Sequence, residues 1–207
     1  TISKVADILQ KNEVTNAQDF INQCKNPQIL SFYNIPSKNL EGYLFPDTYY
    51  FDYEMDAKKV IQTMVDNFYS KIITIPELIN ISPEELHKKV VLASIVEREY
   101  RIASEAPLIA SVFTNRLKRN IGLYSCATVE YIITEIQGLP HPEVITYEDL
   151  KIDNPYNTYK WAGLPPGAIS NPGIIALSSA ANPPKTQYYF FRLQDAQKGN
   201  HVFTKDF

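Results

Sequence analysis

The 207-residue chain contains few of the residues that build metal sites, disulfide frameworks and nucleotide-binding loops. Cys24 and Cys126 lie far apart in the sequence and belong to no CxxC pair. They could pair with each other, but neither a disulfide framework nor a zinc site is indicated. The three histidines are dispersed, and seven glycines are too few for a dinucleotide-binding fingerprint. The sequence therefore predicts a protein that needs no metal and no organic cofactor.

Long apolar runs and basic stripes are also missing from the sequence. A membrane-spanning helix needs about 18 or more consecutive apolar residues, and no such run is present. The net charge of -3 argues against a nucleic-acid partner. No signal peptide is visible, but both ends look cut, so a leader or an anchor could have been removed. The composition fits one medium-sized domain, or a domain with a smaller companion.

Aromatic residues, by contrast, are abundant, with 14 tyrosines and 10 phenylalanines. Exposed rings often line sugar-binding clefts because a ring face packs against the apolar face of a sugar. The same residues also fill protein cores, and for any single ring that is the more common situation. The motifs GxSxG, HExxH and the P-loop are absent, which excludes several other classes of catalytic site.

Hydrophobic periodicity and capping signals predict an α+β fold in which helices dominate. Glycine, proline and β-branched patterns predict an extended aromatic connector at 40–53 and a hairpin with strands at 187–193 and 201–204 around Gly199. The helices expected from their apolar spacing and start signals lie at 2–10, from Asn16, and at 56–71, 82–102, 105–118, 128–136, from Thr146, and from 171 to about 182.

The helix expected at 82–102 carries the most informative residues. Ser82, Pro83 and Glu85 form its start signal. At 100° per residue, Glu99 lies near the middle of an apolar arc, whereas Glu97 lies almost opposite. Glu97 is expected to form a surface ion pair with Arg101, four residues further on.

Glu99 requires a different explanation, because a carboxylate on an apolar face must be paired, protonated or open to a cleft. A free glutamate with a pKa of about 4.3 is only ~0.2% protonated at pH 7, and a pKa of about 6 makes ~10% available as an acid. Glu99 is therefore a candidate acid/base group. The alternative, a buried glutamate held by hydrogen bonds from a neighbouring loop, is equally compatible with the periodicity. Arg98 and Arg101 lie close in sequence and could oppose a rise in its pKa.

Two later segments are rich in groups that could contact a sugar. Residues 154–159 combine amides, a hydroxyl and two rings, and residues 163–167 form a rigid Gly-Leu-Pro-Pro-Gly turn. Such loops serve equally well as plain connectors.

Taken together, these motifs resemble the YceG-like family of endolytic murein transglycosylases. The matching segments follow the order of the family along the whole chain, at 40–49, 92–99, 111–117, 127–131, 156–159, 163–169, 171–173 and 201–203. The combination is highly specific, although each motif alone is not. One departure is Cys126-Ala127, where many relatives carry Asp-Pro.

The resemblance implies site residues. The catalytic residue of the family is the second glutamate of the segment ending in Glu-x-Glu, which is Glu99 here. The resemblance also implies substrate-binding roles for Tyr156, Asn157, Thr158 and Tyr159, with Asn115 and the loop at 163–167 as supporting elements.

The resemblance further implies the organisation and setting of the protein. We expect a small N-terminal helical remnant of a LysM-like region at 1–45 and a YceG-like catalytic domain at 46–207. The expected partners are peptidoglycan glycan strands and, through the family, cell-wall synthases. The full-length protein is expected to be membrane-anchored and to act on the extracytoplasmic face of the membrane, with this chain as a soluble fragment.

The implied reaction cleaves the β-1,4 bond between N-acetylmuramic acid and N-acetylglucosamine and leaves a 1,6-anhydro end. Two alternatives stay open. One is a muramidase-type hydrolase with a second carboxylate such as Glu41 or Asp47. The other is a glycan-binding module without catalytic activity.

Overall fold

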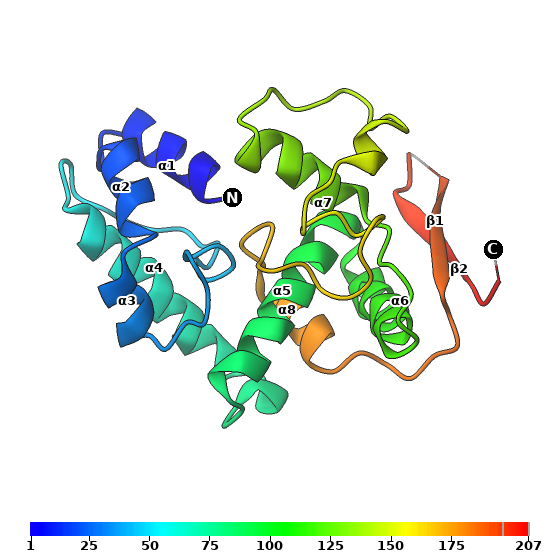
Figure 1. Ribbon diagram of the computed structural model, residues 1–207. Coiled ribbons are helices and arrows are strands. Elements are labelled where there is room, and N and C mark those ends of the chain that lie inside the picture. Colours follow the sequence, from blue (N-terminus) through cyan, green and yellow to red (C-terminus); the bar gives the residue numbers. More distant parts are fainter. Residues whose placement is uncertain (196, 207) are drawn as a thin grey trace.

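The computed structural model describes residues 1–195 and 197–206, and it shows a helix-rich α+β fold with one antiparallel hairpin. The helices α1 to α4 gather at one end of the molecule, α5 runs through the middle, and the hairpin lies at the other end (Figure 1). The predicted fold class is therefore confirmed. Its longer elements are α1 (Ile2–Lys11), α2 (Ala17–Gln23), α3 (Pro27–Phe32), α4 (Ala57–Ile72), α5 (Pro83–Glu99), α6 (Ala106–Lys118), α7 (Cys126–Tyr131), α8 (Ile174–Ala181), β1 (Phe190–Asp195) and β2 (Asn200–Thr204).

Local capping signals account for the start of several helices. Asn16 accepts a hydrogen bond from the Asp19 amide, and Ser82 accepts one from the Glu85 amide, as the sequence predicts. Thr146 and Asp149 also form reciprocal bonds, but only a short 3-10 turn follows at Asp149–Lys151. The helix expected from Thr146 is therefore absent, because the chain leaves the turn at Ile152 and reaches Pro155 three residues later. The helix expected at 128–136 begins at Cys126 and continues as a π-helical turn over Ile132–Ile136.

The second half of helix α5 is buried on nearly all sides rather than on one face. Every residue from Val90 to Val96 is buried, and α5 packs against α6, α7 and α8. A helix surrounded in this way lacks the polar face that a helical wheel assumes. It also ends at Glu99, not near Ile102, because Tyr100 has an extended backbone. Glu99 therefore occupies the last helical position.

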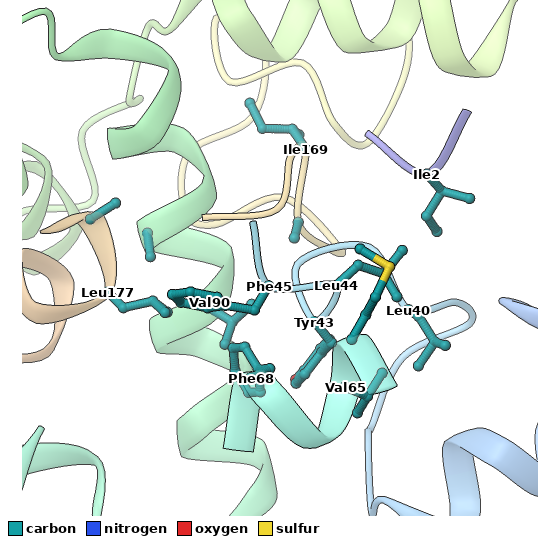
Figure 2. Close-up of a cluster of buried hydrophobic side chains, with 14 of the residues drawn as sticks. Ile2, Leu40, Tyr43, Leu44, Phe45, Val65, Phe68, Val90, Ile169 and Leu177 are labelled. Carbon is teal, nitrogen blue, oxygen red and sulfur yellow. The ribbon is translucent and has the colours of Figure 1, made fainter. Parts of the chain in front are cut away.

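The segment predicted to be an extended connector begins as part of the core. Tyr43, Leu44 and Phe45 lie in one buried cluster with Phe68 of α4 and Val90 of α5, as Figure 2 shows. The Gly42 and Leu44 amides both donate to the Asn171 side chain, which fixes this turn beside the loop before α8. One continuous hydrophobic cluster thus joins the N-terminal helices to α5 and α8. The division at 45/46 stays a prediction.

The hairpin packs against α6 through β1, and its strands pair in antiparallel register from Phe190 with Thr204 to Leu193 with His201. Gly199 lies in the turn with φ +70°, which favours glycine. Within the described residues, no helix is both long enough and apolar enough to cross a bilayer.

Candidate active site

A cleft of about 900 Å³ opens at the end of α5, and Glu99 is one of its lining residues. The two strands of the hairpin form one wall of the cleft. Residues of the segment 123–126 and Tyr159, which come from earlier in the chain, also line it. The remaining lining residues are Arg116, Leu123, Tyr124, Cys126, Tyr159, Phe190, Phe191, Arg192, Leu193, His201, Val202, Thr204 and Asp206. An aromatic cleft with a few polar groups is a typical site for a small ligand or a sugar chain.

The carboxyl group of Glu99 is held by a short hydrogen bond from the Ser125 hydroxyl. Burial raises the pKa of Glu99 above its usual value, and the charge of Glu130 raises it further. The Ser125 hydrogen bond, His201 and Arg98 act in the opposite direction. Arg98 does oppose the rise, as the sequence suggested, but it also forms an ion pair with Glu130 at 2.7 Å. The net direction is the one required of a general acid at neutral pH.

Ser125 is itself fixed by a buried hydroxyl network. Its amide donates to Thr158 Oγ1 at 3.1 Å, and Thr158 Oγ1 lies 3.0 Å from Thr128 Oγ1. Thr128 Oγ1 in turn donates to the Ser125 carbonyl. The segment 125–128 and the 154–159 loop therefore position the hydroxyl that contacts Glu99. Sequence reasoning missed Ser125, since nothing in the residues near it indicates a contact with a helix that ends 26 residues earlier.

The residues predicted to bind substrate occupy different places in the structure. Tyr159 lines the cleft, and its hydroxyl lies 3.0 Å from Cys126 Sγ. Asn157 and Thr158 are buried, and Asn157 donates to the carbonyls of Leu150 and Ile152. Direct contact of these two residues with a substrate stays a prediction, but their position indicates that they shape the loop carrying Tyr159.

Tyr156 and Asn115 lie outside the residues that line the cleft. The ring of Tyr156 packs against Tyr131 and borders a separate pocket with Ile35 and Pro166. The Asn115 amide donates to the carbonyls of Thr186 and Tyr188, so it holds the segment that leads into β1. Their proposed substrate contacts likewise stay predictions.

Glu97 does not form the predicted ion pair with Arg101. The helix ends at Glu99, which removes the four-residue helical spacing. Instead, Glu97 accepts a hydrogen bond from the Gly173 amide at 3.0 Å, at the start of α8. A carboxylate at that end of a helix is favourable. Glu97 is thus a link between two packed helices.

The two carboxylates considered for a hydrolase lie elsewhere. Glu41 is buried and accepts hydrogen bonds from the Ile2 amide and the Asn171 side chain. Burial raises its pKa to about 7. Asp47 forms an ion pair with Lys71 and borders another pocket. Neither lines the cleft with Glu99, so the structure removes both from the role of second catalytic carboxylate. Among the described residues, the other acidic residue that lines the cleft is Asp206.

His201 anchors the hairpin wall to the rest of the site. Its amide donates to Glu105, and its Nδ1 lies 2.7 Å from Glu105 Oε2. Both side chains are largely buried. Groups of three or more residues suited to holding a metal ion do not occur in the described ranges 1–195 and 197–206.

These features define a helical α+β protein with one desolvated glutamate in an open aromatic cleft. A model of the YceG-like family matches residues 1–207, and the chain belongs to that family. A YceG-like protein of Listeria monocytogenes with a crystal structure superposes with a TM-score of 0.85 at 33% identity, covering 100% of this chain and 70% of that one.

Two relatives that carry the name endolytic murein transglycosylase are similar over most of the chain. The one from Bacillus subtilis (strain 168) is 37% identical over 195 residues, covering 91% of this chain and 52% of the relative. The one from Streptococcus pneumoniae serotype 2 (strain D39 / NCTC 7466) is 33% identical over 201 residues, covering 91% and 35%. The chain thus spans about half the length, or less, of these relatives.

Proposed function

We propose that this chain is the catalytic part of an endolytic peptidoglycan lytic transglycosylase, with Glu99 acting first as acid and then as base. The observation that carries the proposal is the desolvated Glu99 carboxyl at the cleft. The names of the relatives support the substrate class. The bond to be cleaved is the β-1,4 linkage from N-acetylmuramic acid to N-acetylglucosamine.

In the proposed mechanism, protonated Glu99 gives its proton to the glycosidic oxygen as the C1–O bond breaks. The O6 hydroxyl of the same muramyl residue forms the new bond to C1, and the Glu99 carboxylate takes the O6 proton. The products are a free hydroxyl on the leaving sugar and a 1,6-anhydro end, and Glu99 is again protonated. Because the nucleophile belongs to the substrate, one carboxylate is sufficient.

A muramidase-type hydrolase is the second candidate, since Asp206 also lines the cleft. In that reaction a second carboxylate assists water or forms a covalent intermediate. The two reactions differ in product mass, because an anhydro end is lighter by one water than a reducing end. Replacement of Asp206 by Asn leaves an anhydro-forming reaction largely intact and strongly impairs a two-carboxylate hydrolase.

The decisive experiment treats purified peptidoglycan with the wild type and with Glu99→Gln and weighs the products. We expect anhydro ends from the wild type and a loss of at least about 10³-fold in rate for the variant, because the acid is removed. Cleavage by the variant at the wild-type rate would exclude Glu99 as the catalytic residue. Glycan binding by the wild type without any cleavage would favour a binding module.

The proposed substrate lies outside the cytoplasm, so we place the reaction on the extracytoplasmic face of the membrane. Anchoring of the full-length protein and association with cell-wall synthases are part of the same proposal, and they rest on the family resemblance.

A further inference from the structure

Arg116 is a buried cation at the cleft that forms no salt bridge with an acid of the described residues, although the charge of Glu99 acts on it. It comes from α6, and only 6% of its surface is exposed. Its Nε donates to the Tyr189 carbonyl and its Nη1 to the Leu123 carbonyl, both at 2.6 Å. The rings of Tyr124 and Phe190 lie 5.6 and 5.3 Å from its guanidinium carbon. This cage fixes the guanidinium group without an ion pair, and burial lowers its pKa while the charge of Glu99 raises it.

After these two hydrogen bonds, the N–H donors of Arg116 that remain are at the Nη1 and Nη2 end of the side chain. A guanidinium has five N–H donors in a rigid fork. Its Nη2 donates to none of the residues that the structure describes, and Arg116 is one of the residues that line the cleft. A buried charge is costly unless it is paired, and Arg98 shows the usual solution, an ion pair with Glu130. An anion in the cleft would be the missing partner of Arg116.

The backbone around Arg116 supports a binding role. Tyr124 has φ +51°, a left-handed conformation that bulky residues rarely adopt. In that conformation the ring of Tyr124 packs against the Arg116 guanidinium, and Tyr124 also lines the cleft. Strained residues of this kind are concentrated at ligand sites.

The charges that line the cleft also favour an anion. Arg116 and Arg192 are cationic, whereas Glu99 and Asp206 are the acids of the same lining. Burial favours the neutral form of Glu99 and so lessens the negative charge of this lining. The cleft is therefore less acidic than the chain as a whole, which carries a net charge of -3.

We propose that Arg116 binds a carboxylate carried by the muramyl residue of the substrate, an inference that rests on the proposed function. N-acetylglucosamine is neutral, so only every second sugar can carry such a group. In a peptide-free strand it is the lactyl carboxylate. In a peptide-bearing strand the lactyl carboxyl is part of an amide, and the carboxylates belong to the peptide. The guanidinium fork matches a carboxylate in geometry. Arg116 would thus set which of the two alternating β-1,4 bonds lies at Glu99.

The test compares binding of four glycan preparations to the Glu99→Gln protein, which measures binding without cleavage. The preparations are peptide-free strands, the same strands with lactyl carboxylates converted to methylamides, peptide-bearing strands, and those strands with peptide carboxylates converted to methylamides. We expect neutralisation to weaken binding by on the order of tenfold in at least one pair, or about 1.4 kcal/mol. The pair that responds identifies the source of the carboxylate.

The variant arm adds Arg116→Gln, with Arg119→Gln as the matched control. Arg119 stacks on the Tyr189 ring and is not one of the cleft residues. Arg116→Gln should bind charged and neutral strands equally, whereas Arg119→Gln should keep the tenfold difference. Arg116→Lys, which retains charge without the fork, should keep a smaller difference. If Arg116→Gln does not fold, two comparisons remain. Charged and neutral strands are compared in the protein that keeps Arg116, and the same pair is compared in Arg116→Lys.

Equal binding of charged and neutral strands in both pairs would overturn the role of Arg116. A difference that persists in Arg116→Gln would overturn it as well. Failure of the proposed function has a separate signature, because the wild type would then release no anhydro ends while the binding difference remained measurable.

Discussion

At the residue scale, the properties of Glu99 follow from its place at the end of α5. The helix is buried from Val90 to Val96, and Glu99 lines the cleft three residues later, so its carboxyl group loses solvent while staying accessible to a ligand. Ser125 provides the opposing influence by donating a hydrogen bond to the carboxylate. The two largest influences on the pKa of Glu99 are therefore burial, which raises it, and the Ser125 hydroxyl, which lowers it.

Replacement of Ser125 by Ala should shift this balance. Loss of a donor to the carboxylate raises the pKa of Glu99 further, because the charged form loses a hydrogen bond worth about 1 kcal/mol. The limb of the pH profile of kcat/KM that reports Glu99 should move to higher pH. Ser179→Ala is the control, since that hydroxyl bonds the Ile175 carbonyl within α8. A limb that moves to lower pH would contradict this account of Ser125.

Glu99 should also lower the stability of the fold at neutral pH. Its pKa is raised on folding, so the folded state keeps a proton that the unfolded state releases. The stability linked to this proton is complete below the unfolded pKa of about 4.3 and is lost as the pH rises through the folded pKa.

Glu99→Gln, which stays neutral, should therefore unfold at higher urea concentration than the wild type at pH 7.5. The two proteins should behave alike at pH 4. The exposed Glu148→Gln is the control and should show no such pH-dependent difference. A variant that is less stable than the wild type at pH 7.5 would show that the charged carboxylate is better stabilised than its burial indicates.

At the element scale, local signals predicted where helices begin better than where they end. The caps at Asn16 and Ser82 depend on residues three positions apart, so they can be read directly. Just beyond the end of α5, Arg101 lies against the hairpin turn at Gly199, a contact between segments far apart in the chain. Similarly, the partner of Glu97 is Gly173, a contact that no short-range pattern contains.

The hairpin depends on Glu105 for its position as a cleft wall. Glu105→Ala removes the partner of both the His201 amide and the His201 ring, at a cost of about 2–3 kcal/mol for buried charged hydrogen bonds. We expect faster hydrogen exchange at the amides of β1 and β2, unchanged protection in α5, and cleavage about tenfold slower.

The exposed Glu143→Ala serves as the control for this change. Normal hairpin protection in Glu105→Ala would mean that packing of β1 on α6 alone holds the wall.

At the scale of the whole molecule, composition and periodicity predicted a helix-dominated α+β fold with a C-terminal hairpin, and they singled out Glu99. They did not predict that the hairpin walls the Glu99 cleft, or that Ser125 and Arg116 converge there. Such contacts depend on tertiary packing between segments distant in sequence. Residue types singled out the 154–159 loop and the family resemblance implied substrate roles for 156–159, but only the structure separates Tyr159 at the cleft from Asn157 in the interior.

Gly42 connects the N-terminal helices to α5 and offers a test of cooperativity. Its φ is +95°, and a Cβ there would lie 2.5 Å from Val90 Cγ1 and 2.7 Å from Ala168 Cβ. We expect Gly42→Ala to cost more than about 3 kcal/mol through backbone strain and overpacking, and to destabilise both ends of the molecule together.

Gly138→Ala is the matched control, because Gly138 also has a positive φ, +67°, but open space around it. It should cost about 1 kcal/mol. Thermal unfolding followed by far-UV circular dichroism measures both values. A Gly42→Ala protein that unfolds in two steps would indicate that residues 1–45 form an independent unit.

The order of the cleft residues along the chain has a consequence for biosynthesis. Helix α5 leaves the ribosome well before β1 and β2, so a nascent or prematurely released chain carries Glu99 without the wall that faces it. Under the proposed function, wall-cleaving activity would arise only once translation has passed Thr204. Incomplete products would then be harmless to the cell that makes them.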